Sequence, residues 1–178
     1  MPESEKAPRA ESVEALLSLT QRVADEERAR GAALTTKTST LAGFSGTILA
    51  IVLALGRDLF ARPLGDPADA LVPILFVVSV LALAAAGTLA IRGVLRTQQR
   101  LTIGADQLRA FAAPPWTSTD PVEINGNALA SLARAISHDR ALNDRKARLA
   151  DLAALALLVG LLAVAGQALC LGVTEMFD

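Results

Sequence analysis

The side chains of this sequence that could do chemistry are mainly arginines at helical spacing. Arg92, Arg96 and Arg100 recur every four residues, so in a helix they form one ladder. A second group shares one helical face through spacings of four, three, four and three, namely Arg134, His138, Ala141, Arg145 and Arg148. Rows of guanidinium groups bind anionic lipid headgroups or a phosphate ligand. Three alternatives stay open for these candidate ligand-binding residues: a solvated face, lipid contact, or a specific nucleotide site.

No other motif predicts catalysis or metal binding. His138 is the only histidine and Cys170 the only cysteine, which excludes an internal disulfide and leaves no zinc-binding spacing. Ser137, His138 and Asp139 are consecutive, and consecutive residues of a helix point in different directions, so they cannot form a catalytic triad. The sequence has no glycine-rich phosphate-binding loop. We therefore expect no enzyme activity, no metal and no cofactor.

The basic residues flank three long apolar runs, Leu41–Leu55, Leu71–Ile91 and Leu149–Val173. A helix needs about 20 apolar residues to cross a bilayer core, and the first run reaches that length as residues 34–56, with Lys37 near the lipid headgroups. The chain is 52% hydrophobic and 20% charged with a mean hydropathy of +0.43, so its charges are segregated from these runs. We expect an all-α integral membrane protein with three transmembrane helices, extended by cytoplasmic amphipathic helices.

The distribution of lysine and arginine predicts the orientation, because basic residues accumulate on the cytoplasmic side. They cluster before the first run, after the second and before the third, which places the amino terminus inside and the carboxyl terminus outside. The net charge of -1 argues against nucleic-acid binding. The expected segments are a cytoplasmic arm (1–33), a first transmembrane helix (34–56), an external loop (57–70), a second transmembrane helix (71–91), a cytoplasmic helical hairpin (92–148), a third transmembrane helix (149–173) and an external tail (174–178).

Proline and glycine predict where the helices bend or end. Gly31 is a candidate bend between the arm and the first transmembrane helix. The second helix should continue to about Phe111, before two consecutive prolines. Trp116–Gly126 contains one proline, Pro121, as well as Ser, Thr, Asn and Gly, and is typical of a loop. No proline follows as far as Val173, so the third helix should be one long rod.

Small residues recur every four positions in the apolar runs, most clearly at Ala42, Gly46, Ala50 and Ala54. Comparable ladders surround Ala86 in the second run and Gly160 in the third. Such spacing lets helix backbones approach closely in lipid. The ladders serve either packing within one chain or association of several copies, and these alternatives stay open.

Polar residues within the runs are few. The candidate pore-lining residues are Ser45, Thr47 and Gln167, which could equally be packed polar side chains. Asp151 begins the third run and can pair with Arg148 one turn earlier. No charge lies mid-membrane, which argues against an ion-coupled carrier. Three helices cannot enclose a useful pore, so a channel would require several copies.

Two stretches resemble a known family: Thr36–Gly46, which opens the first membrane helix, and Asn143–Leu149, which enters the last. With the chain's size and its charged helical middle, they resemble the Pycsar transmembrane effectors of bacterial anti-phage systems, and more loosely the SLATT-type effectors. Lys37 and Gly46 match the family's entry into the first helix, whereas Thr35 replaces its acidic residue and Thr38 its alanine.

The resemblance implies a homo-oligomeric effector in the bacterial inner membrane. A cyclic nucleotide from a partner cyclase would bind the cytoplasmic helices, and the membrane helices would then impair the membrane. The alternative is a structural adaptor that docks a cytoplasmic partner through its helical stalk.

Overall fold

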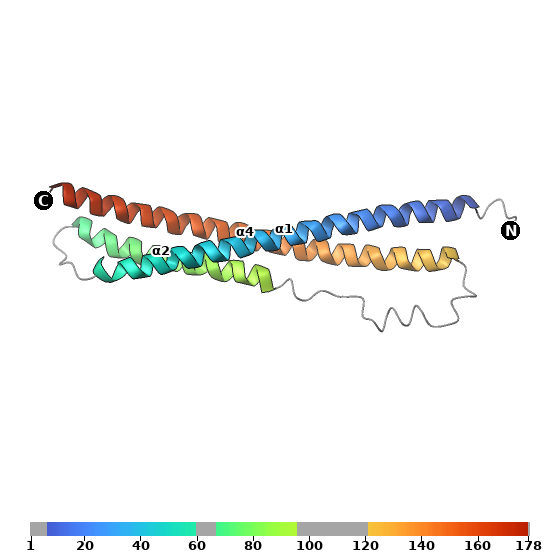
Figure 1. Cartoon of the computed structure of the whole chain (residues 1–178), viewed down its shortest axis with the longest axis horizontal. Helices are drawn as coiled ribbons and strands as arrows, with labels where there is room; N and C mark the ends of the chain where they lie inside the picture. Colours follow the sequence, from blue (N-terminus) through green and yellow to red (C-terminus); the bar gives the residue numbers. More distant parts are fainter. Residues whose placement is uncertain (1–6, 60–66, 96–120, 178) are drawn as a thin grey trace. The chain divides into compact units, whose positions relative to one another are not determined.

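The computed structural model describes the backbone of residues 7–59, 67–95 and 121–177, and the side chains of residues 12–56, 71–95 and 125–171 (Figure 1). These residues form three helices: α1 (Ala7–Leu59), α2 (Pro67–Leu95) and α4 (Pro121–Phe177). Each helix contains a stretch long and apolar enough to cross a membrane. The expectation of an all-α chain with three such helices is therefore confirmed for the described residues.

The helices are longer than the apolar runs. α1 continues to Leu59 and α2 starts at Pro67, so both enter the predicted loop 57–70. α4 starts at Pro121, so the prediction of a loop throughout Trp116–Gly126 is wrong. Proline is favoured at the first position of a helix, because the backbone N–H that it lacks would have no partner there and its φ is already helical. This accounts for the starts of both α2 and α4. The predicted continuation to Phe111 lies outside the described residues.

The chain divides into two compact units, and α1 and α4 contribute to both. The described part of unit 1 consists of residues 7–33 of α1 and 121–144 of α4. The described part of unit 2 consists of residues 34–59 of α1, all of α2, and residues 145–177 of α4. α1 is helical through Gly31, the residue predicted as a bend between the arm and the first transmembrane helix.

In unit 2 the buried positions of every helix recur at intervals of seven residues. The buried series are Thr38, Ser45 and Val52 in α1, Val72, Ser79, Ala86 and Gly93 in α2, and Ala153, Gly160 and Gln167 in α4. A seven-residue repeat is the signature of helices that supercoil left-handedly around a common seam. Most of these buried residues are small, as expected where helix backbones approach closely.

Three glycines of unit 2 lie where a side chain of a neighbouring helix leaves little room for a Cβ atom. A Cβ added at Gly160 would lie 2.9 Å from Leu83 Cγ, and Leu83 is fully buried. A Cβ at Gly93 would lie 3.0 Å from Thr38 Cγ2, and one at Gly87 3.2 Å from Ser45 Oγ. Gly87 and Gly93 of α2 and Gly160 of α4 therefore serve packing within the chain.

Large apolar side chains cover the outside of unit 2. Leu81 is 64% exposed, Leu162 63% and Leu169 71%. A water-soluble monomer rarely shows so continuous an apolar surface. The inside of unit 2 is thus small and partly polar, whereas its outside is large and apolar.

Gly160→Val tests the close approach of α2 and α4. Overpacking a tight site costs roughly 1–3 kcal/mol, so the variant should unfold at a lower temperature in detergent. Gly43→Val is the matched control, because a Cβ at Gly43 meets no described atom within 4 Å. Equal thermal stability of the two variants would contradict this packing.

Candidate functional site: a polar cluster and an exposed small-residue face

A cluster of polar side chains joins α1 to α4 in unit 1. We define the polar cluster as Glu27 and Arg30 of α1 with Arg140, Asn143 and Asp144 of α4. The Glu27 side chain is only 9% exposed. Its Oε1 accepts a hydrogen bond of 3.0 Å from Arg140 Nε, and its Oε2 one of 3.2 Å from Asn143 Nδ2. The buried carboxylate therefore has a partner on each oxygen, as burial of a charge requires.

Asn143 is the second buried member of the polar cluster, with 4% of its surface exposed. Its Nδ2 also donates to the main-chain oxygen of Glu27 at 2.9 Å, so one amide group contacts both the backbone and the side chain of α1. A Cβ at Gly31 would lie 2.9 Å from Asn143 Oδ1. Gly31 thus leaves room for the asparagine side chain.

The outer edge of the polar cluster is an exposed ion pair. Arg30 Nη2 donates to Asp144 Oδ1 at 3.0 Å, and both side chains are about half exposed, at 45% and 50%. Arg30 Nη1 also lies 3.7 Å from Glu27 Oε2. Exposed pairs of this kind contribute little stability, so the buried Glu27–Asn143 contacts carry most of the energy of the polar cluster.

These contacts keep Glu27 ionised. The hydrogen bonds from Arg140 and then from Asn143 lower the pKa of the Glu27 carboxyl, and burial opposes them only in part. The positive charges of Arg140 and Arg30 lower this pKa further.

A second ion pair joins the same two helices in unit 2. Lys37 Nζ lies 3.3 Å from Asp151 Oδ1, whereas the sequence suggested Arg148 as the partner of Asp151. The partners are 114 residues apart, as are Arg30 and Asp144 in unit 1. Lys37 follows Arg30 by seven residues, and Asp151 follows Asp144 by seven residues. The sequence offset between the paired residues of α1 and α4 is thus the same in unit 1 and in unit 2.

The candidate anion-binding residues are all on the surface where they are described. Arg134 and His138 are exposed in unit 1, and Arg92, Arg145 and Arg148 are exposed in unit 2. Arg134 Nε donates to the main-chain oxygen of Ala130 at 3.2 Å. Arg96 and Arg100 lie outside the described residues. The described members are thus exposed side chains, and none of them lines the groove of unit 1 described below.

The small-residue ladder of α1 faces away from the chain. Ala42 is half-buried, whereas Gly46, Ala50 and Ala54 are exposed, and a Cβ at Gly46 would meet no described atom within 4 Å. In contrast, Gly160 packs against Leu83. The structure therefore separates two sets that look alike in the sequence.

The three candidate pore-lining residues have different environments. Ser45 is buried and its hydroxyl donates to the Ala42 oxygen at 3.1 Å, while Thr47 is exposed and donates to the Gly43 oxygen at 3.0 Å. Both hydroxyls are thus bonded to their own helix. Gln167 is buried, and its Nε2 has no hydrogen-bond partner among the described residues.

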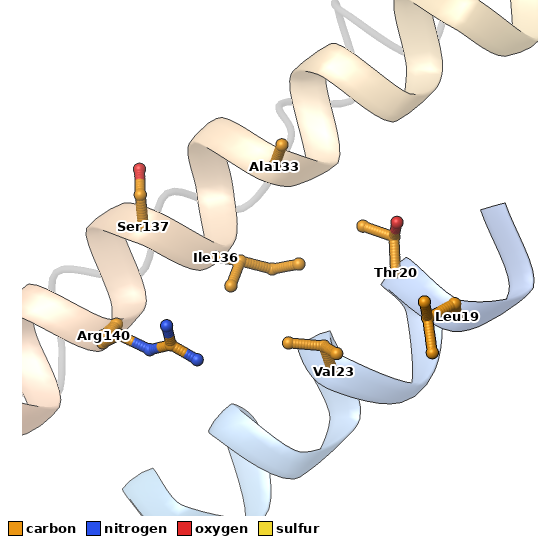
Figure 2. Close-up of a pocket in the computed structure, with 7 residues that line it drawn as sticks. All are labelled: Leu19, Thr20, Val23, Ala133, Ile136, Ser137 and Arg140. Atoms are coloured by element: carbon orange, nitrogen blue, oxygen red, sulfur yellow. The ribbon is translucent and has the colours of Figure 1, made fainter. Parts of the chain in front are cut away.

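A groove of about 410 Å³ lies between α1 and α4 in unit 1 (Figure 2). Its lining is Leu19, Thr20, Val23, Ala133, Ile136, Ser137 and Arg140. The hydroxyls of Thr20 and Ser137 donate to main-chain oxygens of their own helices. The groove is therefore mainly apolar, with the Arg140 guanidinium at one end. Among the described residues, no group of three or more His, Cys, Asp or Glu side chains could hold a metal ion.

Neither the polar cluster nor the groove was predicted from the sequence. Asn143 lies one seven-residue repeat before the buried Ala150, and Glu27 lies three residues after Ala24, which is buried two such repeats before Thr38. A search for polar residues within that repeat, and not for ladders of like charge, would have found them.

Comparison with models of protein families, with curated proteins and with solved structures gives no match for this chain.

The lowered pKa of Glu27 predicts acid sensitivity. Because its pKa is lower in the folded than in the unfolded chain, its stabilising effect is complete above the unfolded value of about 4.3 and is lost as the pH falls through the folded value. Glu27→Gln should be less stable than the wild type at pH 7, and this difference should shrink by about pH 3. Thermal unfolding in detergent at both pH values measures it. A difference independent of pH would show that the carboxylate charge is not what stabilises the polar cluster.

Proposed function

We propose that this chain is a multi-pass protein of the bacterial inner membrane that assembles into homo-oligomers and impairs that membrane during anti-phage defence. In this proposal unit 1 is cytoplasmic, the amino terminus is inside and the carboxyl terminus outside. A nucleotide second messenger binds the exposed arginines and triggers the effector. The resemblance to Pycsar transmembrane effectors suggests the defence role and the nucleotide.

One observation supports the proposed assembly of several copies, namely the exposed face of Gly46, Ala50 and Ala54 on α1. The other side of α1, with Thr38, Ser45 and Val52, already packs within the chain. A helix that faced only lipid would gain nothing from small residues at four-residue spacing, because lipid chains pack equally well against leucine. Contact with a helix of a second copy is stabilised by such residues, since two helix backbones approach closely only where the side chains between them are small.

The interior of a single chain supports the need for several copies. The buried hydroxyls of Thr38, Ser45 and Ser79 all donate to main-chain oxygens of their own helices. They are therefore already bonded, and a water path would more readily form between chains than within one. α1 and α4 each continue from unit 1 into unit 2, so a ligand on unit 1 acts on helices that also form unit 2.

The apolar groove of unit 1 favours a second candidate function. Leu19 is 57% exposed beside it, and Val23 and Ile136 are half-buried in it. An adaptor that docks a cytoplasmic partner would use such a surface for a helix of that partner. This candidate predicts that a soluble protein co-purifies and that the membrane stays intact.

Dye efflux from liposomes tests the proposed function. Liposomes that contain the purified chain should retain the dye until one member of a cyclic-nucleotide panel is added. Constant efflux would indicate a pore that opens without a ligand. Absence of efflux under every condition, with oligomers verified by cross-linking, would favour the adaptor.

Gly46→Leu tests the exposed small-residue face. The larger side chain should block association and abolish efflux while the thermal stability of the chain stays unchanged, because a Cβ at Gly46 meets no described atom of its own chain within 4 Å. Ala85→Leu is the matched control, since Ala85 is an exposed small residue of α2 outside this face. Equal efflux from both variants would show that copies do not associate through Gly46.

A further inference from the structure

One side of α4 in unit 2 is basic at its start and apolar along the rest of its length. The residues of this side follow one another at spacings of three and four, which places them on one face of a helix. We define the amphiphilic strip as these residues, namely Arg145, Arg148, Leu152, Leu155, Val159 and Leu162. Both arginines are exposed, and the four apolar side chains are 43% to 63% exposed. The described residues of unit 2 therefore leave the amphiphilic strip uncovered.

The two arginines of the amphiphilic strip have no acidic partner in the described part of unit 2. Asp151 is the only acidic residue with a described side chain in this unit, and it pairs with Lys37 at 3.3 Å. Neither Arg145 nor Arg148 forms a side-chain hydrogen bond or an ion pair with a described residue. Their guanidinium groups are thus available to an anion from outside the chain. Phosphate fits best, because a guanidinium binds it through two parallel hydrogen bonds.

The apolar part of the amphiphilic strip matches one leaflet of a bilayer in length. Leu152 and Leu162 are ten residues apart, which is about 15 Å along a helix at ~1.5 Å per residue. The hydrocarbon core of a bilayer is about 30 Å thick, so one leaflet contributes about 15 Å. A phosphate bound at Arg148 would therefore have its acyl chains beside the apolar residues of the strip.

This combination of groups distinguishes between possible ligands. A nucleotide or another water-soluble phosphate ester would bind the arginines but would gain nothing from a row of exposed aliphatic side chains. A zwitterionic lipid has a cationic group next to its phosphate, and that group is repelled by the two guanidinium groups. An anionic phospholipid uses both parts of the strip, because it joins a net negative head to apolar chains.

We propose that the amphiphilic strip is a binding site for an anionic phospholipid, with the lipid phosphate at Arg145 and Arg148 and an acyl chain along the apolar residues. The inference rests on the membrane insertion that is part of the proposed function. It assigns these two arginines to lipid, so that Arg92, Arg134 and His138 are the described candidates for binding the second messenger.

Native mass spectrometry of the full chain in detergent micelles tests this site. Phosphatidylglycerol and phosphatidylcholine with the same acyl chains are added in equal amounts, and the chain should retain phosphatidylglycerol in preference. The double variant Arg145→Gln with Arg148→Gln should bind phosphatidylglycerol about thirtyfold more weakly, since each cation near an anionic lipid surface strengthens binding about fivefold.

The matched control is the double variant Arg22→Gln with Arg28→Gln. It removes the same amount of charge from exposed residues of unit 1 and should leave the preference for phosphatidylglycerol unchanged. Equal retention of the two lipids by the wild type would overturn the proposal. So would wild-type binding by the Arg145→Gln, Arg148→Gln variant, or an equal loss of binding in the control.

Glycerol phosphate, which resembles the lipid head without its chains, distinguishes a lipid site from a site for soluble phosphates. It should not displace phosphatidylglycerol at equal concentration, because it makes no contact with the apolar residues. Displacement at equal concentration would overturn the lipid assignment in favour of a soluble phosphate ligand.

Circular dichroism verifies that each variant is helical. If the double variant does not accumulate in membranes, Arg148→Gln alone replaces it, with an expected loss of about fivefold; unchanged binding would equally refute the site. The result is separate from that of the efflux assay, since lipid retention is measured without a nucleotide and without a sealed membrane. A chain that retains phosphatidylglycerol but never releases dye would support the lipid site and contradict the proposed function.

Discussion

The parallel alignment of α1 and α4 is the constraint on which the rest of this structure depends. The same offset of 114 residues relates Arg30 to Asp144 and Lys37 to Asp151, so the two helices pair in one register in both units. Buried positions at seven-residue intervals extend this relation along unit 2. Such a repeat is compatible with continuous contact only when the helices keep their phase.

The inner positions where the helices pack are occupied by different kinds of residues in the two units. In unit 2, small residues and glycines occupy inner positions of the helices, and α2 and α4 approach closely where Gly160 packs against Leu83. In unit 1 a charged residue and an amide occupy inner positions and satisfy each other. In lipid, apolar side chains gain no free energy by contacting one another in place of lipid chains, so small residues stabilise a helix pair by letting the backbones come close. Polar groups give selectivity in an aqueous environment, where apolar burial already drives association.

The exposed surfaces of the two units differ in the same way. Unit 2 has an outer layer of large aliphatic side chains, interrupted on α1 by the face of Gly46, Ala50 and Ala54. In unit 1, basic and acidic residues alternate on the exposed surface around an apolar groove. A bilayer is a solvent that fits the surface of unit 2, and water is one that fits the surface of unit 1. In the proposed function, the interruption on α1 is the contact for a second copy of the chain.

The sequence by itself determined the helices and their apolar lengths, because apolar runs of this length satisfy their backbone hydrogen bonds within a bilayer only as helices. It also indicated which residues are small, basic or polar. Only the tertiary structure decided which of them face inward. Gly46 and Gly160 occur in similar ladders, yet one is exposed and the other packs against Leu83, since the neighbouring helix covers one side of each helix only. In the same way, Asp151 contacts Lys37 and not Arg148, because the register of two helices depends on contacts between residues more than a hundred positions apart.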